Sequence, residues 1–225
     1  MKKIFFVGGG KGGVGKSTVS IGLIDYLLSQ GEKVLLVETD TSNPDVWKMH
    51  KDEIPCILID LDDANGWIEL VNACDEHSDS TVLVNTAARN NRGVAVYGET
   101  LNATLDELKR ELITYWVINR QRDSLELLKE FMEALPAAKL HVVRNSYFGE
   151  ERKFELYEGS NVKKLVEERG SSLTFPDLAD RVSDDLFSKR LSVTAALDQL
   201  PIGNRAELLR WRKEAHRMFE TVSHD

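Results

Sequence analysis

The sequence predicts an α/β fold, a doubly wound and mostly parallel sheet of about seven strands in a single domain over residues 1–225. Short, continuously apolar runs alternate with segments of helical period along the whole chain. The first forty residues read as strand, glycine-rich loop, helix and strand, which is the order of a parallel βαβ unit. The sequence contains no linker or internal repeat that would indicate a second domain.

The amino-terminal half supplies the first four expected strands. Lys3–Val7 begins like a signal peptide, but its apolar run is too short for one, and we interpret it as a strand leading into glycines. Thr18–Gln30 carries apolar residues at helical spacing and ends before Gly31. The elements expected next are strands over 33–40 and 55–61, a helix over 67–74 and a strand over 80–85.

The alternation continues in the second half. Expected helices cover 101–110, 125–135 and 161–169, and expected strands cover 113–119, 139–144 and 172–175. After Pro176 the pattern is helical, and one apolar face comprises Leu208, Trp211, Ala215, Met218, Phe219 and Val222. We expect this last helix to dock on the sheet.

Composition excludes several classes of protein. The net charge of −8 argues against a general binder of nucleic acid, so any such contact needs a local basic patch. No run of about 18 apolar residues exists, so we expect no membrane-spanning helix. Cys56 and Cys74 have neither disulfide-framework nor zinc-site spacing, which fits a reducing cytoplasm.

The segment GGGKGGVGKST contains the phosphate-loop pattern GxxxxGK[ST] between an expected strand and an expected helix. Glycines let successive backbone N–H groups converge on an anion, and the helix start adds its positive dipole end. Lysine then reaches the β- and γ-phosphates, and the serine hydroxyl ligates Mg²⁺. The alternative is a glycine-rich turn without a ligand. The predicted nucleotide contacts are Gly10, Gly12, Gly13, Val14, Gly15, Lys16, Ser17 and Thr18.

The same segment resembles the deviant Walker A motif, KGGxGK[ST], of the ParA/MinD family of ATPases. The resemblance implies bound ATP and Mg²⁺ and a homodimer that forms with nucleotide. It also implies catalytic roles for Lys11 and Lys16, with Lys11 reaching across the dimer to the partner's phosphates. The alternative for Lys11 is a solvated loop charge.

Two positions depart from the family pattern. Where the second strand of the family ends in Asp-x-Asp, this chain has Glu38 and Asp40. The resemblance implies that Glu38 helps to hold Mg²⁺ through water and that Asp40, also near the metal, orients the attacking water; a surface turn is the alternative. Asn85 stands where the family's next strand ends in aspartate, and an amide brings no charge to pair with Mg²⁺. We therefore expect nucleotide binding to survive, with weakened metal affinity or hydrolysis.

The resemblance also places the base. It implies that Asn145, at the end of a strand, reads the adenine edge and that the loop at Pro176 packs near the base. For Asn145 the alternative is a residue of a strand-end turn. The expectation of ATP rather than GTP comes from the resemblance alone.

The segments WVINRQRDS, VVRNSYFG and LPIGNRAELLRW resemble plasmid-borne members of the family, the StbB/TraL-type proteins of plasmid stability and conjugative transfer. Residues 204–219 carry a net charge of +3, five basic against two acidic side chains. We favour a docked helix with a solvated basic back over a non-specific DNA patch or a membrane helix. The DNA candidates are Arg212, Lys213 and Arg217, and Arg89 and Arg92 are candidates for nucleotide sensing or for a partner.

The leading hypothesis is a dimerising Mg-ATP switch in plasmid segregation or conjugation, with DNA or a plasmid-encoded adaptor as candidate partner. The alternative is a nucleotide-held scaffold that hydrolyses ATP slowly or not at all. A metabolic enzyme on this fold is a third hypothesis. We discount its iron–sulfur version because both cysteines precede Asn85, and its ligase version because no substrate pocket is evident.

Overall fold

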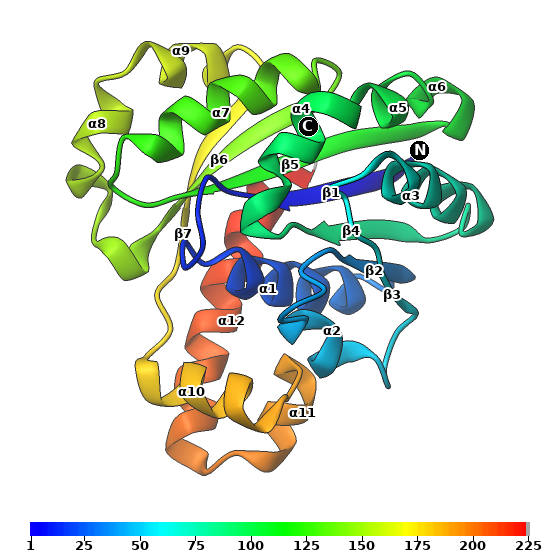
Figure 1. Ribbon diagram of the computed structural model, residues 1–225. Coiled ribbons are helices and arrows are strands. Elements are labelled where there is room, and N and C mark those ends of the chain that lie inside the picture. The colour runs from blue at the N-terminus through cyan, green and yellow to red at the C-terminus, as the bar shows by residue number, and fades with distance from the viewer. Residues whose placement is uncertain (224–225) are drawn as a thin grey trace.

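Seven strands lie in one sheet in the order β3-β2-β4-β1-β5-β6-β7, and every neighbouring pair is parallel (Figure 1). The computed structural model describes residues 1–223, without the side chains of Arg89 and Ser223. The predicted fold class is confirmed, and the sheet is wholly parallel. The strands are β1 (Lys2–Gly8), β2 (Val34–Glu38), β3 (Cys56–Leu58), β4 (Thr81–Asn85), β5 (Arg110–Ile118), β6 (Lys139–Asn145) and β7 (Gly170–Phe175).

Helices cover both faces of the sheet (Figure 1). One face carries α1 (Lys16–Ser29), α2 (Asp45–His50), α10 (Asp180–Lys189), α11 (Val193–Gln199) and α12 (Ile202–Ser223). The other carries α3 (Ala64–Glu76), α4 (Asn91–Tyr97), α5 (Glu99–Asn102), α6 (Leu105–Leu108), α7 (Asp123–Ala134), α8 (Glu155–Glu158) and α9 (Asn161–Glu167). Three short 3₁₀ turns are η1 (Ala88–Asn90), η2 (Ser146–Phe148) and η3 (Glu151–Lys153).

The central strand β1 is apolar at consecutive positions, without the alternation of apolar and polar residues found in half-buried strands. Ile4 and Phe6 of β1 belong to the core under α3 and α7, whereas Phe5 and Val7 belong to the core under α1 and α12. All four side chains are at most 5% exposed. A strand buried on both faces needs apolar residues at every position, so the continuous run is a property of the central position.

The last helix docks on its own sheet, as predicted. The six residues of its apolar face are buried, and Trp211 packs edge-on against Phe175 with ring centroids 5.6 Å apart. Trp211 Nε1 also donates to the carbonyl of Pro176 at 3.1 Å. The apolar face of α12 is therefore part of the core. Within residues 1–223, no helix has both the length and the apolar character needed to span a membrane.

The single helix predicted over 101–110 is wrong, because this segment contains residues of two short helices, α5 and α6, and its last residue belongs to β5. Lys109 takes a left-handed conformation (φ 52°), which ends α6 and lets Arg110 begin β5. The buried Arg110 guanidinium donates to the carbonyls of Cys74, His77 and Ser80 at 2.7–2.8 Å. This contact ties β5 to the end of α3. The helices α2, α4 and α8 were not predicted, because each is too short to show a clear period.

Candidate nucleotide-binding site

A cavity of about 390 Å³ lies where the carboxyl ends of the strands meet the start of α1. Parallel sheets place their ligand sites at this edge, where neighbouring connections leave in opposite directions. Nine predicted site residues line the cavity: Gly12, Gly13, Gly15, Lys16, Ser17, Thr18, Asp40, Asn145 and Pro176. Gly10, Lys11, Val14 and Glu38 were also predicted, but they are not part of its wall.

The glycine loop has the backbone shape that an anion cradle needs. Gly13 and Gly15 have φ values of +74° and +102°, which residues with a Cβ rarely adopt. Gly15 precedes the first residue of α1, and no side chain caps that helix or places an acid in its first turn. The free N–H groups of the helix start, together with its dipole, therefore favour a negatively charged ligand.

Lys16 contributes a cationic side chain to the wall of the cavity. Its side chain is buried, and its Nζ donates to the carbonyl of Lys11 at 2.9 Å, which bends the lysine back along the loop. Burial lowers the pKa of Lys16 to about 8, against the opposing attraction of Asp40 and Glu38. A phosphate at this position would add negative charge and favour the protonated amine.

Lys11 lies outside the cavity and reaches the start of α7. Its ammonium forms an ion pair with Asp123, and the two side chains are 44% and 52% exposed. This pair holds the pKa of Asp123 below its ordinary value. Gly10, next to Lys11, packs against the same helix, and a Cβ there would come within 3.1 Å of Leu127 Cδ1. The loop is thus anchored on α7 through residues that do not line the cavity.

Glu38 and Asn85 end the neighbouring strands β2 and β4 and contact each other. Asn85 Nδ2 donates to both carboxylate oxygens of Glu38, at 3.0 and 3.1 Å. The Glu38 side chain is fully buried, and this burial raises its pKa to about 7 against the lowering effect of its hydrogen bonds. Asn85 lines the cavity, whereas Glu38 does not. The metal role implied for Glu38 stays a prediction that this arrangement does not support.

Asp40 stands on the cavity rim at the start of the loop after β2. Its Oδ1 accepts from Ser42 Oγ at 2.7 Å and from the backbone N–H of Asn43 at 3.2 Å, so a local turn fixes the carboxylate. Thr39 beside it hydrogen-bonds to Asn90 and to the carbonyl of Asn85. The loop after β2 and the segment after β4 are therefore linked by side chains as well as by the sheet.

Asn145 contacts the phosphate loop directly. Its Nδ2 donates to the carbonyl of Val14 at 2.9 Å, and its Oδ1 accepts from the backbone N–H of Tyr147 at 3.1 Å. Asn145 therefore acts as a strand-end turn residue that braces the loop, and it also lines the cavity. Its role in base recognition stays a prediction.

The far end of the cavity was largely missed by the sequence analysis. Beyond Pro176 it is lined by residues of the segment after β7 and of α10, together with Tyr147, 63% exposed. Asp177 has a pKa above its ordinary value, mainly because of partial burial and then because of nearby Asp180. Only hydrophobic period is visible for α10 in the sequence, so nothing there signals which face meets the cavity. The remaining lining residues at this end are Leu178, Ser183 and Phe187.

The basic candidates outside the cavity divide into two groups. Arg212 donates from Nε to the buried Asp25 at 2.7 Å and is therefore engaged in the docking of α12. Lys213, Arg217 and Arg92 are exposed. The side chain of Arg89 lies outside what the structure describes.

A glycine loop ahead of the first helix, a buried lysine at its end and a cavity at the carboxyl edge of a parallel sheet define a nucleotide-binding protein of the P-loop class. Residues 5–151 match the model of the CobQ/CobB/MinD/ParA nucleotide binding domain. The chain belongs to this family, and the resemblance is confirmed. Protein MobD of Acidithiobacillus ferrooxidans is 64% identical over 225 residues, which cover 100% of this chain and 99% of that protein.

Solved structures share the fold. The MinD cell division protein of Aquifex aeolicus aligns with a TM-score of 0.58 over 98% of both chains at 14% identity. The cell division ATPase MinD of Pyrococcus furiosus aligns with a TM-score of 0.56 at 16% identity, over 96% of this chain and 99% of its own. A nucleotide-binding protein of Archaeoglobus fulgidus in complex with ADP aligns with a TM-score of 0.50 at 16% identity. The alignment covers 88% of this chain and 92% of that one.

Proposed function

We propose that this protein is a Mg²⁺-dependent ATP switch that dimerises with nucleotide, hydrolyses it and acts in plasmid segregation or conjugative transfer in the cytoplasm. One observation carries the proposal: Lys16, Ser17 and Asp40 line one cavity with the glycine loop. An amine, a hydroxyl and a carboxylate around an anion cradle are the groups that nucleoside triphosphate chemistry requires.

The residues present fit Mg-ATP. Ser17 and Asp40 offer oxygen atoms, which Mg²⁺ prefers. Within residues 1–223, no group of three His, Cys, Asp or Glu side chains could hold a metal by itself. A magnesium ion at this place therefore takes its other ligands from phosphates and water, as is usual for nucleotide sites. The volume of about 390 Å³ lies in the range of small-ligand pockets.

The chemical roles follow from position. Lys16 neutralises charge on the phosphates, and the backbone N–H groups of the loop hold them in place. The proposed role of the Asp40 carboxylate, which Ser42 and Asn43 hold in the cavity wall, is to orient a water for attack on the γ-phosphate. Bound Mg²⁺ supplies electrostatic stabilisation of the charge that develops on the transferred phosphoryl group.

Dimerisation is proposed through Lys11. Its side chain is half exposed on the surface beside the cavity, where a second copy could present a phosphate. In that state the ammonium exchanges Asp123 for the partner's nucleotide, which makes closure depend on nucleotide. The relative named MobD and the plasmid-like segments of the sequence favour a plasmid process.

A second candidate function is a nucleotide-held clamp with little or no hydrolysis. The observation in its favour is Asn85, which brings no negative charge to the metal side of the cavity and has both ends of its amide engaged within the protein. Turnover separates the two candidates, because both require nucleotide binding and dimerisation.

The test combines binding of a fluorescent ATP analogue, steady-state ATP hydrolysis and light scattering, with Mg²⁺ present. Lys16→Ala should abolish binding, and Lys11→Ala should retain binding but lose the dimer. Lys129→Ala, an exposed lysine on α7, is the matched control. Turnover that rises with protein concentration supports the switch, and binding with a dimer but no turnover supports the clamp. A Lys11→Ala protein that still dimerises with ATP refutes the role of Lys11, and a wild-type protein that binds no nucleotide refutes both functions.

A further inference from the structure

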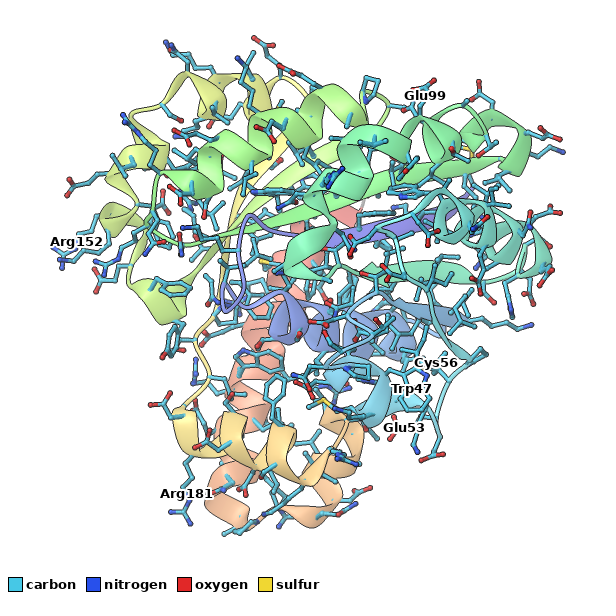
Figure 2. All side chains as sticks on the ribbon, in the orientation of Figure 1. Trp47, Glu53, Cys56, Glu99, Arg152 and Arg181 are labelled. Carbon is cyan, nitrogen blue, oxygen red and sulfur yellow. The ribbon has the colours of Figure 1, made fainter. Side chains whose placement is uncertain are left out.

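The Glu38 carboxylate is a buried acceptor with three hydrogen bonds, which come from two residues of the cavity wall. Two come from Asn85 Nδ2 at 3.0 and 3.1 Å, and one comes from the backbone N–H of Asp40 at 3.0 Å. The backbone N–H of Trp47, the third residue of α2, also lowers the pKa of this carboxyl group. Glu38 therefore links the ends of β2 and β4 to the start of α2, the helix on which Figure 2 labels Trp47.

The Asn85 amide has a defined orientation, because the residues on its two sides form different hydrogen bonds with it. Its NH₂ group faces the Glu38 carboxylate, which can only accept, and its Oδ1 accepts from Ser20 Oγ of α1 at 2.8 Å. An aspartate here would still accept from Ser20, but it would place a second carboxylate against Glu38. A glutamine at position 38 would point its own NH₂ group at some of the N–H donors whose hydrogen bonds the carboxylate now accepts. Glu38 and Asn85 are thus complementary to each other as well as to their surroundings.

We propose that Glu38 and Asn85 form one positioning pair, which holds the Asp40 backbone, the start of α2 and Ser20 around the cavity, and that Glu38 is not a metal ligand. The pair acts on catalysis through Asp40, since the Asp40 N–H that Glu38 accepts belongs to the residue whose carboxylate stands on the rim. The two departures from the family pattern, a longer acid at 38 and an amide at 85, are then one coupled change. The catalytic part of this inference rests on the proposed function.

Exchanging the carboxylate and the amide between positions 38 and 85 tests the pair. In the double variant Glu38→Gln/Asn85→Asp, the glutamine NH₂ donates to the new carboxylate, its Oε1 accepts from the Asp40 N–H, and the aspartate accepts from Ser20. Each single variant has a mismatch, and the double variant removes it. Residues in one buried network show this kind of non-additivity, whereas independent residues do not.

The local readout is hydrogen exchange of the Asp40 backbone amide, followed by NMR without nucleotide. In each single variant the Asp40 amide should exchange about tenfold or more faster than in wild type, because its acceptor is lost or shared with a mismatched partner. The double variant should return to within about threefold of wild type. The matched control is Glu69→Gln/Asn72→Asp, the same chemical changes on the exposed surface of α3, and it should leave the exchange of the Asp40 amide unchanged.

The functional readout is turnover and the Mg²⁺ dependence of ATP affinity. The single variants should lose about tenfold in kcat with KM changed less than about threefold, since the glycine loop and Lys16 are untouched, and the double variant should recover. The ratio of ATP affinity with Mg²⁺ to ATP affinity with EDTA should be within about twofold of the wild-type ratio in Glu38→Gln. A tenfold fall in that ratio would make Glu38 a metal ligand and overturn the proposal.

The outcomes separate this proposal from the proposed function. Additive effects in the double variant, or single variants whose Asp40 amide exchanges as in wild type, overturn the pair whether or not ATP is hydrolysed. If wild type does not hydrolyse ATP, hydrolysis is refuted, and the exchange data still decide the pair. If Asn85→Asp does not fold, a folded double variant supports the pair and an unfolded one overturns it.

Discussion

Alanine substitutions at Gly13 and Gly15 separate backbone strain from steric exclusion in the phosphate loop. At Gly13 φ is +74°, and no atom of the surrounding protein lies within 4 Å of the position a Cβ would take. Gly13→Ala should therefore cost only the strain of a left-handed L-residue, about 1–2 kcal/mol of unfolding free energy. At Gly15 φ is +102°, and the added Cβ would stand 2.2 Å from Asn145 Nδ2.

Gly15→Ala has a second cost because the Asn145 side chain must move. That movement breaks the hydrogen bond from Nδ2 to the carbonyl of Val14, and loss of a buried hydrogen bond costs about 1–3 kcal/mol. The expected total for Gly15→Ala is about 2–5 kcal/mol, the sum of strain and the lost bond. Nucleotide affinity should fall more at Gly15 as well, since the loop loses its brace.

The assay is urea unfolding of both variants and of Asn145→Ala in each background, with the dissociation constant of a fluorescent ATP analogue measured in parallel. Asn145→Ala should cost about 1–3 kcal/mol in wild type. In the Gly15→Ala background it should cost less than about 0.5 kcal/mol, because the bond is already lost. Equal costs for the two glycine substitutions, or additivity with Asn145→Ala, would refute the reasoning.

Three further predictions concern the fold and the loop. Arg110→Ala should lower the free energy of unfolding by about 3 kcal/mol, because three carbonyls lose a buried charged donor. Denaturant titration measures this loss, and Arg110→Lys should recover only part of it. A loss below about 1 kcal/mol in Arg110→Ala would contradict this reasoning. Burial lowers the pKa of His50, so its proton binds more readily in the unfolded chain, and stability should fall as pH drops below the unfolded value of about 6.5. Melting temperatures from pH 7 to 5 should fall less in His50→Gln, and equal slopes would refute this. Asp123→Asn frees Lys11, so light scattering should detect the ATP-dependent dimer at lower protein concentration with stability unchanged; a dimer that requires more protein would contradict the exchange of partners.

The phosphate end of the cavity could be predicted from sequence because it is local. The eight residues from Gly10 to Ser17 are consecutive, a loop shaped by its own glycines that leads into the first two residues of α1, and most of them line the cavity. The sheet was equally accessible, since strands buried on both faces are continuously apolar. Short helices such as α2 lack a readable period, and the carboxyl end of α6 depends on the conformation of Lys109 and the distant contacts of Arg110.

The polar residues were less predictable because their partners are remote. Asn145 braces Val14 across 131 positions of sequence, Asn85 contacts Glu38 across 47, and Arg212 reaches Asp25 across 187. A charge assessed from sequence alone is assumed to face solvent or ligand, which is the average behaviour of charged side chains. Glu38 and Arg212 break this assumption, since each finds a protein partner that only the fold brings near. The same fact explains why Glu38 was predicted to help hold the metal and why Arg212 was a candidate for DNA contact, whereas the structure pairs Glu38 with Asn85 and Arg212 with the buried Asp25. A charged residue near a site is therefore informative about chemistry only after its hydrogen-bond partners inside the protein are known.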